Sequence, residues 1–193
     1  MNYLAHAFLS NDNSDLLIGN FIADHLRGND FKNYSPQIIE GIYLHRRIDS
    51  FTDSHLNFKA SKRLFYNGFE RYSGILVDIY FDYFLAKNFN NYSNSSLNEF
   101  SLNVYDTYSA HKQLLPTSSS NFLEYVIRNN IYYNYSTLSG IEKVLLHLSH
   151  RIKHPIMLND SIFILKQYEK ELEENFKLLF DDAMKEFANK PSL

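Results

Sequence analysis

The residues best placed to do chemistry lie in one stretch of the chain, residues 41–53. There His45, Asp49 and Asp53 follow one another at intervals of four residues. On a helix this spacing puts the three side chains on one face, which drifts slowly around the axis. Ions such as Mn²⁺ take imidazole and carboxylate ligands, so a His and an Asp one turn apart can hold the same ion. The alternative is a solvated helix face carrying an ordinary His–Asp hydrogen bond.

A second pair of acids, Asp78 and Asp82, shows the same spacing inside the strongly apolar segment 72–88. Burying a carboxylate among Ile, Leu, Tyr and Phe side chains is costly unless a cation, a metal ion or a hydrogen-bond donor pairs with it. The pair therefore predicts either a buried polar site or the one solvent-facing stripe of an otherwise buried helix.

A third set consists of Asn2, His6, Gly19-Asn20 and Asp24, in which His6 stands in the apolar N-terminal segment and Asp24 near the end of segment 14–27. Taken singly, His6 has an ordinary explanation as a hydrogen-bonded core histidine, and Asp24 as a solvated aspartate.

A basic group lies late in the chain and consists of His147, His150, Arg151 and His154. It can form a phosphate-binding face, because Arg matches phosphate oxygens with paired donors. Alternatively, it can complement the dipole of a helix C-terminus.

The elements that must position these side chains are helices, because helical periodicity dominates the chain of 193 residues. With Gly 6 and Pro 4, the chain has few of the turns that a barrel or sandwich requires. No segment is rich enough in Gly, Ser or Pro to mark a domain boundary. We therefore predict one compact all-α domain over residues 1–193. Ser35 as N-cap and Pro36 as first helical residue open a helix to about Phe51. Other helices are expected over 14–27, 57–69, 72–88, 96–114, 119–131, 140–152 and 159–188.

The composition narrows the chemistry further. Cysteine is absent, which excludes disulfides, thiolate zinc sites and a cysteine nucleophile, so any metal must be held by imidazole and carboxylate. The net charge of −3 argues against a surface that binds nucleic acid. No apolar run approaches the ~20 residues of a membrane span, and the N-terminus does not read as a signal peptide. We expect a cytoplasmic protein that binds neither nucleic acid nor membrane.

Three sequence blocks, taken together, resemble the bacterial acyl carrier protein phosphodiesterases. They are residues 1–6 (MNYLAH), 19–24 (GNFIAD) and 41–53 (GIYLHRRIDSFTD), and residues 77–85 fit a further block. The resemblance extends over nearly the whole chain. It implies an all-α bundle that diverges from the HD-domain metal phosphohydrolases. It also implies removal of 4′-phosphopantetheine from holo-acyl carrier protein with a divalent ion, most readily Mn²⁺, with Mg²⁺ or Fe²⁺ as substitutes.

The same resemblance assigns roles to particular residues. The candidate metal ligands are His6, Asp24, His45, Asp49 and Asp78. A divalent ion there would lower the pKa of a bound water, which then attacks the phosphorus. Further catalytic candidates would neutralise the phosphoryl oxygens or orient the water; they are Arg46, Arg151, Asp53 and Asp82. Two departures stand out: the chain has no His-Asp dipeptide of the HD type, and Tyr83 stands where a His is expected.

The substrate implied by this resemblance is an acidic protein, so we expect a basic docking surface near the site. Cations are concentrated over residues 46–71, as Arg46, Arg47, Lys59, Lys62, Arg63 and Arg71, although an ordinary solvated helix would look the same. Two other functions stay open. An HD-like phosphohydrolase acting on a nucleotide or another small phosphoester would use the same metal site but would need no protein-docking surface. In a non-catalytic helical binding module, the His and Asp residues would be structural. Nothing in the sequence indicates an oligomeric state.

Overall fold

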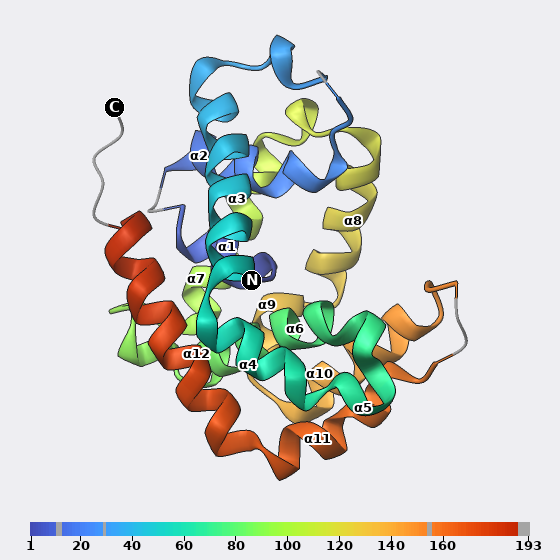
Figure 1. Cartoon of the computed structure of the whole chain (residues 1–193). Helices are drawn as coiled ribbons and strands as arrows, with labels where there is room; N and C mark the ends of the chain where they lie inside the picture. The colour runs from blue at the N-terminus through green and yellow to red at the C-terminus, as the bar shows by residue number, and fades with distance from the viewer. Residues whose placement is uncertain (11–12, 29, 154–155, 189–193) are drawn as a thin grey trace.

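The computed structural model describes residues 1–10, 13–28, 30–153 and 156–188. Within these ranges the regular structure is helical and contains no strand, which confirms the all-α prediction (Figure 1). No helix among the described residues is long and apolar enough to cross a membrane.

The α-helices follow one another along the chain with short connections, several of them single 3₁₀ turns. They are α1 (Tyr3–Phe8), α2 (Ser14–Ile22), α3 (Pro36–Ser54), α4 (Leu56–Leu64), α5 (Tyr66–Phe69), α6 (Ser73–Lys87), α7 (Leu97–Ala110), α8 (Thr117–Arg128), α9 (Ile131–Asn134), α10 (Leu138–Ser149), α11 (Ile162–Gln167) and α12 (Glu169–Ala183). In Figure 1, α3 descends in front of α2, α12 follows the left edge, and α8 stands on the right.

Helix α6 is the central element of the core. Most of its side chains are buried, on all sides of the helix, as expected for a helix that is apolar all round. It packs against α1, α4, α10 and α12. This confirms the prediction of a buried helix over 72–88 and places Asp78 and Asp82 on an element that other helices enclose.

Several predicted boundaries were wrong. The segment 159–188 was expected to be one helix, but it consists of a 3₁₀ turn at Leu158–Ser161, helices α11 and α12, and a π turn at Met184–Ala188. The backbone leaves helical geometry at Tyr168, where φ is −114° and ψ is 23°. The segment 57–69 is also interrupted, because Gly68 adopts φ 94°, which L-residues disfavour. The N-terminus of α3 is as predicted, with the Ser35 side chain accepting from the Ile38 N–H and Pro36 in the first turn.

Helices α2 and α3 cross with their backbones in direct contact. A Cβ added at Gly19 would lie 2.8 Å from the Cα of Gly41, and one added at Gly41 would lie 2.9 Å from the Cα of Gly19. Only glycine at both positions therefore permits this approach. The crossing brings α2 against the N-terminal half of α3, one turn before His45.

Candidate metal centre and active site

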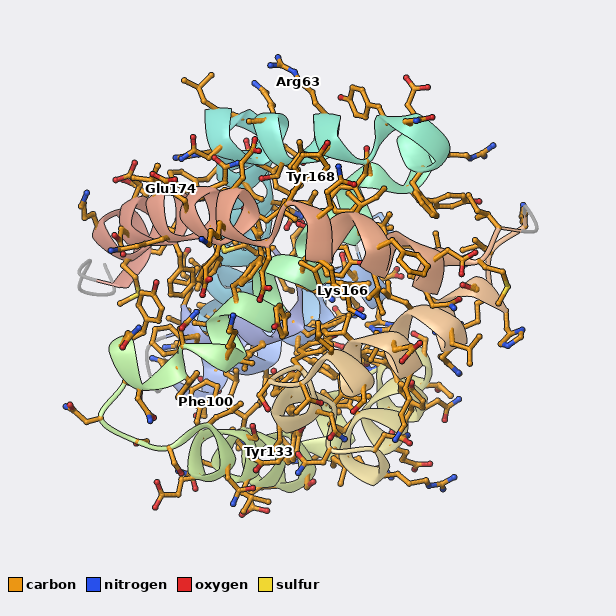
Figure 2. The ribbon with its side chains drawn as sticks, turned by 90° about the horizontal axis from the view of Figure 1, so that it is seen from below. Arg63, Phe100, Tyr133, Lys166, Tyr168 and Glu174 are labelled. Atoms are coloured by element: carbon orange, nitrogen blue, oxygen red, sulfur yellow. The ribbon has the colours of Figure 1, made fainter. Side chains whose placement is uncertain are left out.

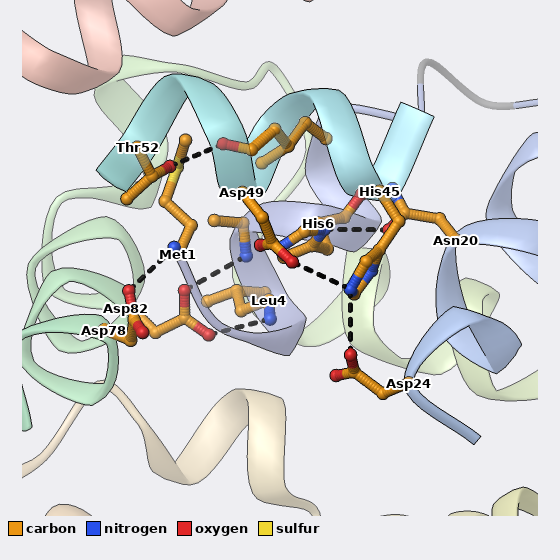
Figure 3. Close-up of polar contacts among 12 residues, drawn as sticks. Met1, Leu4, His6, Asn20, Asp24, His45, Asp49, Thr52, Asp78 and Asp82 are labelled. Carbon is orange, nitrogen blue, oxygen red and sulfur yellow. Dashed lines mark hydrogen bonds and ion pairs between the residues drawn. The ribbon is translucent and has the colours of Figure 1, made fainter. Parts of the chain in front are cut away.

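An asparagine holds two histidines from different helices. Asn20 on α2 places its Oδ1 2.8 Å from His6 Nδ1 and 3.0 Å from His45 Nδ1, and the two imidazoles stack with centroids 4.3 Å apart (Figure 3). Its Nδ2 donates to the carbonyl of His6 and to Ser10 Oγ. Because a carbonyl can only accept, this fixes the orientation of the amide and directs Oδ1 at the rings. Both Nδ1 atoms must therefore carry hydrogen and donate, which leaves the two Nε2 atoms facing away from Asn20.

Both Nε2 atoms face carboxylates. His45 Nε2 lies 3.0 Å from Asp24 Oδ1 and 3.1 Å from Asp49 Oδ2, and His6 Nε2 lies 3.1 Å from Asp49 Oδ1 (Figure 3). A neutral imidazole with its hydrogen on Nδ1 presents a lone pair at Nε2. A lone pair directed at a carboxylate is unfavourable, so a cation must stand between them. This cation is either a proton on the ring or a metal ion.

The pKa shifts of His45, His6 and Asp49 indicate which of these groups holds a proton. Burial alone would lower the pKa of His45, but hydrogen bonds to Asp24 and Asp49 raise it to about 9. Burial lowers the pKa of His6, and the nearby charge of His45 acts in the same direction. Burial would raise the pKa of Asp49, but the two neighbouring imidazoles hold it well below its usual value. Without a metal ion, His45 therefore keeps a proton between two ionised aspartates, whereas neutral His6 turns its Nε2 lone pair towards Asp49, a contact that a metal ion would relieve.

The donor set suits a divalent ion. One ligand atom each from His6, His45 and Asp49 lies within 4.8 Å of the others, a spread that one ion can bridge. Two imidazoles and a carboxylate are ligands for Mn²⁺, Fe²⁺ and Zn²⁺ alike, so the cluster is consistent with a divalent ion without selecting among these metals. A metal ion would take the place of the proton that the site otherwise retains.

These residues line one wall of a cavity of 320 Å³ that opens between α1, α3 and α6. Its lining brings together predicted residues from four segments, and the set includes His6, Asp24, His45, Asp49, Asp53 and Asp78. Apolar and aromatic side chains complete the wall, among them Tyr3, Phe21, Ile75 and Tyr108. The cavity thus combines a metal-binding end with an apolar surface large enough for part of a small organic group.

Asp82 serves a different purpose from the cavity residues. It is fully buried, and its carboxylate accepts the backbone N–H groups of Leu4 (2.8 Å) and Ala5 (3.2 Å) (Figure 3). The residue that precedes α1, Asn2, does not cap the helix with its side chain, which donates to Tyr135 instead. Asp82 therefore supplies the missing N-cap of α1 from 78 residues away, and in doing so it holds the turn that precedes His6.

Asp78 also has a partner outside the imidazole cluster. Its carboxylate pairs with the buried α-ammonium of Met1 at 2.7 Å, and its side chain is 28% exposed. The structure thus separates the two acids that share one helix face in sequence. Asp78 lines the cavity without reaching the histidines, and Asp82 lies beneath it.

The predicted arginines lie outside the cavity lining. Arg46 is exposed, and its guanidinium stacks over Phe31 at 5.3 Å from the ring centroid. Arg151 is exposed as well, yet it is near enough to Tyr3 to oppose the rise in pKa that burial and Asp24 cause there. His147 stacks on Tyr125 at 4.5 Å rather than facing the site, and His154 lies outside the described residues.

Asn20 was grouped with His6 and Asp24 in the sequence but was given no role there, although the structure places it between the two histidines. It is 2% exposed in an apolar segment, between Gly19 and Phe21. A buried amide must be hydrogen-bonded on both ends, so an asparagine enclosed by apolar residues is the signal that would have identified it.

Comparison with known proteins agrees with the site. A family model described as acyl carrier protein phosphodiesterase matches residues 1–183. Curated proteins named acyl carrier protein phosphodiesterase from Salmonella agona (strain SL483) and Salmonella newport (strain SL254) are each 32% identical over 196 aligned residues, covering 98% of this chain and 99% of each relative. No solved structure matches the chain. The match of the family model over almost the whole chain shows that this protein belongs to the acyl carrier protein phosphodiesterase family.

Proposed function

We propose that this protein hydrolyses the phosphodiester of holo-acyl carrier protein, releasing 4′-phosphopantetheine and leaving the carrier serine as a free hydroxyl. We further propose that the reaction depends on a divalent ion held by His6, His45 and Asp49. The observation that carries the proposal is the pair of Nε2 atoms that face carboxylates at 3.0–3.1 Å. Family membership supports the reaction, because the matching relatives are named acyl carrier protein phosphodiesterases.

The charge of the cavity supports the metal requirement. Four carboxylates line it, those of Asp24, Asp49, Asp53 and Asp78, and one is neutralised by the ammonium of Met1. A phosphodiester is itself an anion, so it would be repelled from this cavity unless a cation shared the site. A bound divalent ion would neutralise the phosphoryl oxygens and acidify a water molecule.

The protein's own residues then divide the remaining tasks. Asn20 holds both imidazoles with Nε2 directed into the cavity. Asp24, which is more than half exposed, and Asp53 place carboxylates at the cavity wall, where they can accept a proton from the attacking water. Arg151 stands within electrostatic range of the Tyr3 wall and can attract the phosphate as it enters. Asp82 contributes only by holding the first turn of α1, which carries His6.

Two finer points belong to the same proposal. We favour Mn²⁺ as the physiological ion, because the family resemblance implies it and His and Asp ligands accept it. We also interpret the site as a rearranged HD centre, in which His45 and Asp49 stand one helical turn apart in place of the adjacent His-Asp pair. The reaction would take place in the cytoplasm.

The test is incubation with holo-acyl carrier protein and Mn²⁺, followed by mass measurement of the carrier protein. We expect loss of the phosphopantetheine mass, and no loss when a chelator is present. Asp24→Ala and His45→Ala should abolish the reaction while leaving the helical circular dichroism spectrum intact. His150→Ala, at an exposed position outside the cavity, is the matched control and should keep full activity. Full activity of both site variants would overturn the assignment, and turnover of a nucleotide panel without turnover of the carrier protein would favour a small phosphoester as the substrate.

A further inference from the structure

Helix α4 presents a stripe of one apolar and two cationic side chains to the solvent. Leu56, Lys59 and Arg63 follow at spacings of three and four residues, so they share one helix face. Leu56 is 78% exposed, more than any other large apolar side chain among the described residues. The opposite face is buried against the core, through Phe58, Ser61 and Phe65. The stripe therefore points directly away from the protein, and Figure 2 shows Arg63 projecting outward from this helix.

Helix α4 carries a local excess of positive charge. Residues 56–64 contain three cations and no acid, which leaves 16 basic against 22 acidic residues elsewhere in the chain. Lys59 and Arg63 form no ion pair among the described residues. Helix α12, which packs against α4, is acidic, but several of its acids pair elsewhere: Asp182 with His55 and Lys185, and Glu169 and Glu173 with Lys87.

The chain connectivity puts this stripe beside the cavity. Helix α4 begins three residues after Asp53 and is followed, after α5, by Ile75 on α6; Asp53 and Ile75 both line the cavity. Three residues span at most ~11 Å, and nine helical residues add ~13 Å, so the stripe begins close to the cavity edge and its far end lies at most about 24 Å from it. In the proposed reaction the bond that breaks joins phosphorus to a serine oxygen of the carrier protein. The carrier surface around that serine must therefore reach the cavity, and it will cover what adjoins it.

We propose that the stripe Leu56–Lys59–Arg63 is the docking surface for an acidic face of the carrier protein. This inference rests on the proposed function. Lys59 and Arg63 would pair with carboxylates of the partner and speed its approach, since complementary charge mainly raises the association rate. Leu56 would supply the apolar contact that interfaces place among their charged residues. Arg46 and Arg47, by contrast, are already engaged, with Phe31 and with Glu40.

A charge-matched pair of variants tests this assignment. Lys59→Glu/Arg63→Glu reverses the stripe, and Lys143→Glu/Lys166→Glu makes the same change in net charge at exposed lysines of α10 and α11 that form no ion pair among the described residues. Figure 2 shows Lys166 on a different face from Arg63. Each variant is assayed with holo-acyl carrier protein and with a short peptide carrying phosphopantetheinyl-serine, at low and at high salt. The peptide reports the site alone, because it lacks the body of the carrier protein.

We expect the stripe variant to lose about 10- to 100-fold in kcat/KM on the carrier protein at low salt, with the loss shrinking at high salt. Its kcat/KM on the peptide should stay within about twofold of the unmodified protein, which also shows that it is folded. Leu56→Ala should raise KM for the carrier protein by at least about fivefold. Equal losses in the stripe variant and in the control variant would overturn the docking surface while leaving the proposed function intact. Absence of carrier-protein turnover by the unmodified protein would instead reject the function itself.

Discussion

Replacing Asp82 by Asn gives a sharp test of how the core holds the site. Burial raises the pKa of Asp82 from 3.8 to about 7, although the N–H groups of Leu4 and Ala5 favour its ionised form. In the unfolded chain the carboxyl ionises near 3.8, so between these two pH values the unfolded state has lost a proton that the folded state keeps. The contribution of Asp82 to stability is therefore fully present below about pH 4 and is lost as the pH rises towards 7. At ~1.36 kcal/mol per pH unit, the loss amounts to about 4 kcal/mol.

Asparagine has nearly the same shape and does not ionise, so Asp82→Asn should lack this decline. The difference in free energy of unfolding, variant minus unmodified protein, should rise by about 4 kcal/mol from about pH 4 to about pH 8. The measurement is urea unfolding followed by circular dichroism at intervals across this range, with a chelator present to remove metal effects. Asp106→Asn, at an exposed acid of α7, is the control and should leave the pH dependence unchanged.

The same substitution should act on catalysis in the opposite direction. Asparagine offers one acceptor to two backbone N–H groups, so the turn before His6 is held less firmly. We therefore expect a variant that is more stable at neutral pH and has a lower kcat/KM. A difference in unfolding free energy that stays constant across the pH range would refute the argument that burial raises the pKa of Asp82.

Three further predictions concern the metal centre and the helix crossing. Asn20→Ala removes the acceptor that orients both imidazoles, so Mn²⁺ affinity should fall about 10- to 100-fold by titration calorimetry. Mn²⁺ at about 100 times its Kd should raise the melting temperature by roughly 5–10 °C, and His45→Ala should lose this rise, whereas a rise retained in that variant would exclude His45 as a ligand. Gly41→Ala forces a Cβ into the backbone of α2 and should lower the free energy of unfolding by about 3 kcal/mol. Gly74→Ala, where a Cβ meets nothing within 4 Å, should be neutral or stabilising by up to about 1 kcal/mol in the same urea titration.

Spacing within one helix was predictable from the sequence. His45 and Asp49 were expected on one face of a helix opened by Ser35 and Pro36, and both expectations are confirmed. The reason is that a helical period is local, so it is written directly in consecutive residues. The same locality explains the wrong prediction over 159–188. There the apolar pattern continues across Tyr168, although the backbone leaves helical geometry at that residue.

Contacts between distant segments could not be read in this way. The sequence placed Asp78 and Asp82 on one face, but nothing in it shows that one meets the Met1 ammonium and the other the first turn of α1. Asn20 lies 14 residues from His6 and 25 from His45, and its part as a shared acceptor exists only once α2 has crossed α3. Family resemblance made His6 and Asp24 candidate metal ligands, because each of them, taken singly, has an ordinary explanation.

The contact between Gly19 and Gly41 also determines which ring nitrogen of His45 carries hydrogen. An asparagine side chain is short, so Oδ1 of Asn20 on α2, which also accepts from His6 on α1, reaches His45 Nδ1 on α3 because the backbones of α2 and α3 touch one residue away. The nitrogen of His45 that carries hydrogen is thus set by how closely α2 and α3 pack. A methyl group at the crossing would separate His45 from Asn20 and free its ring to exchange tautomers, and the ¹⁵N chemical shifts of His45 would record that change even in a variant that stays folded.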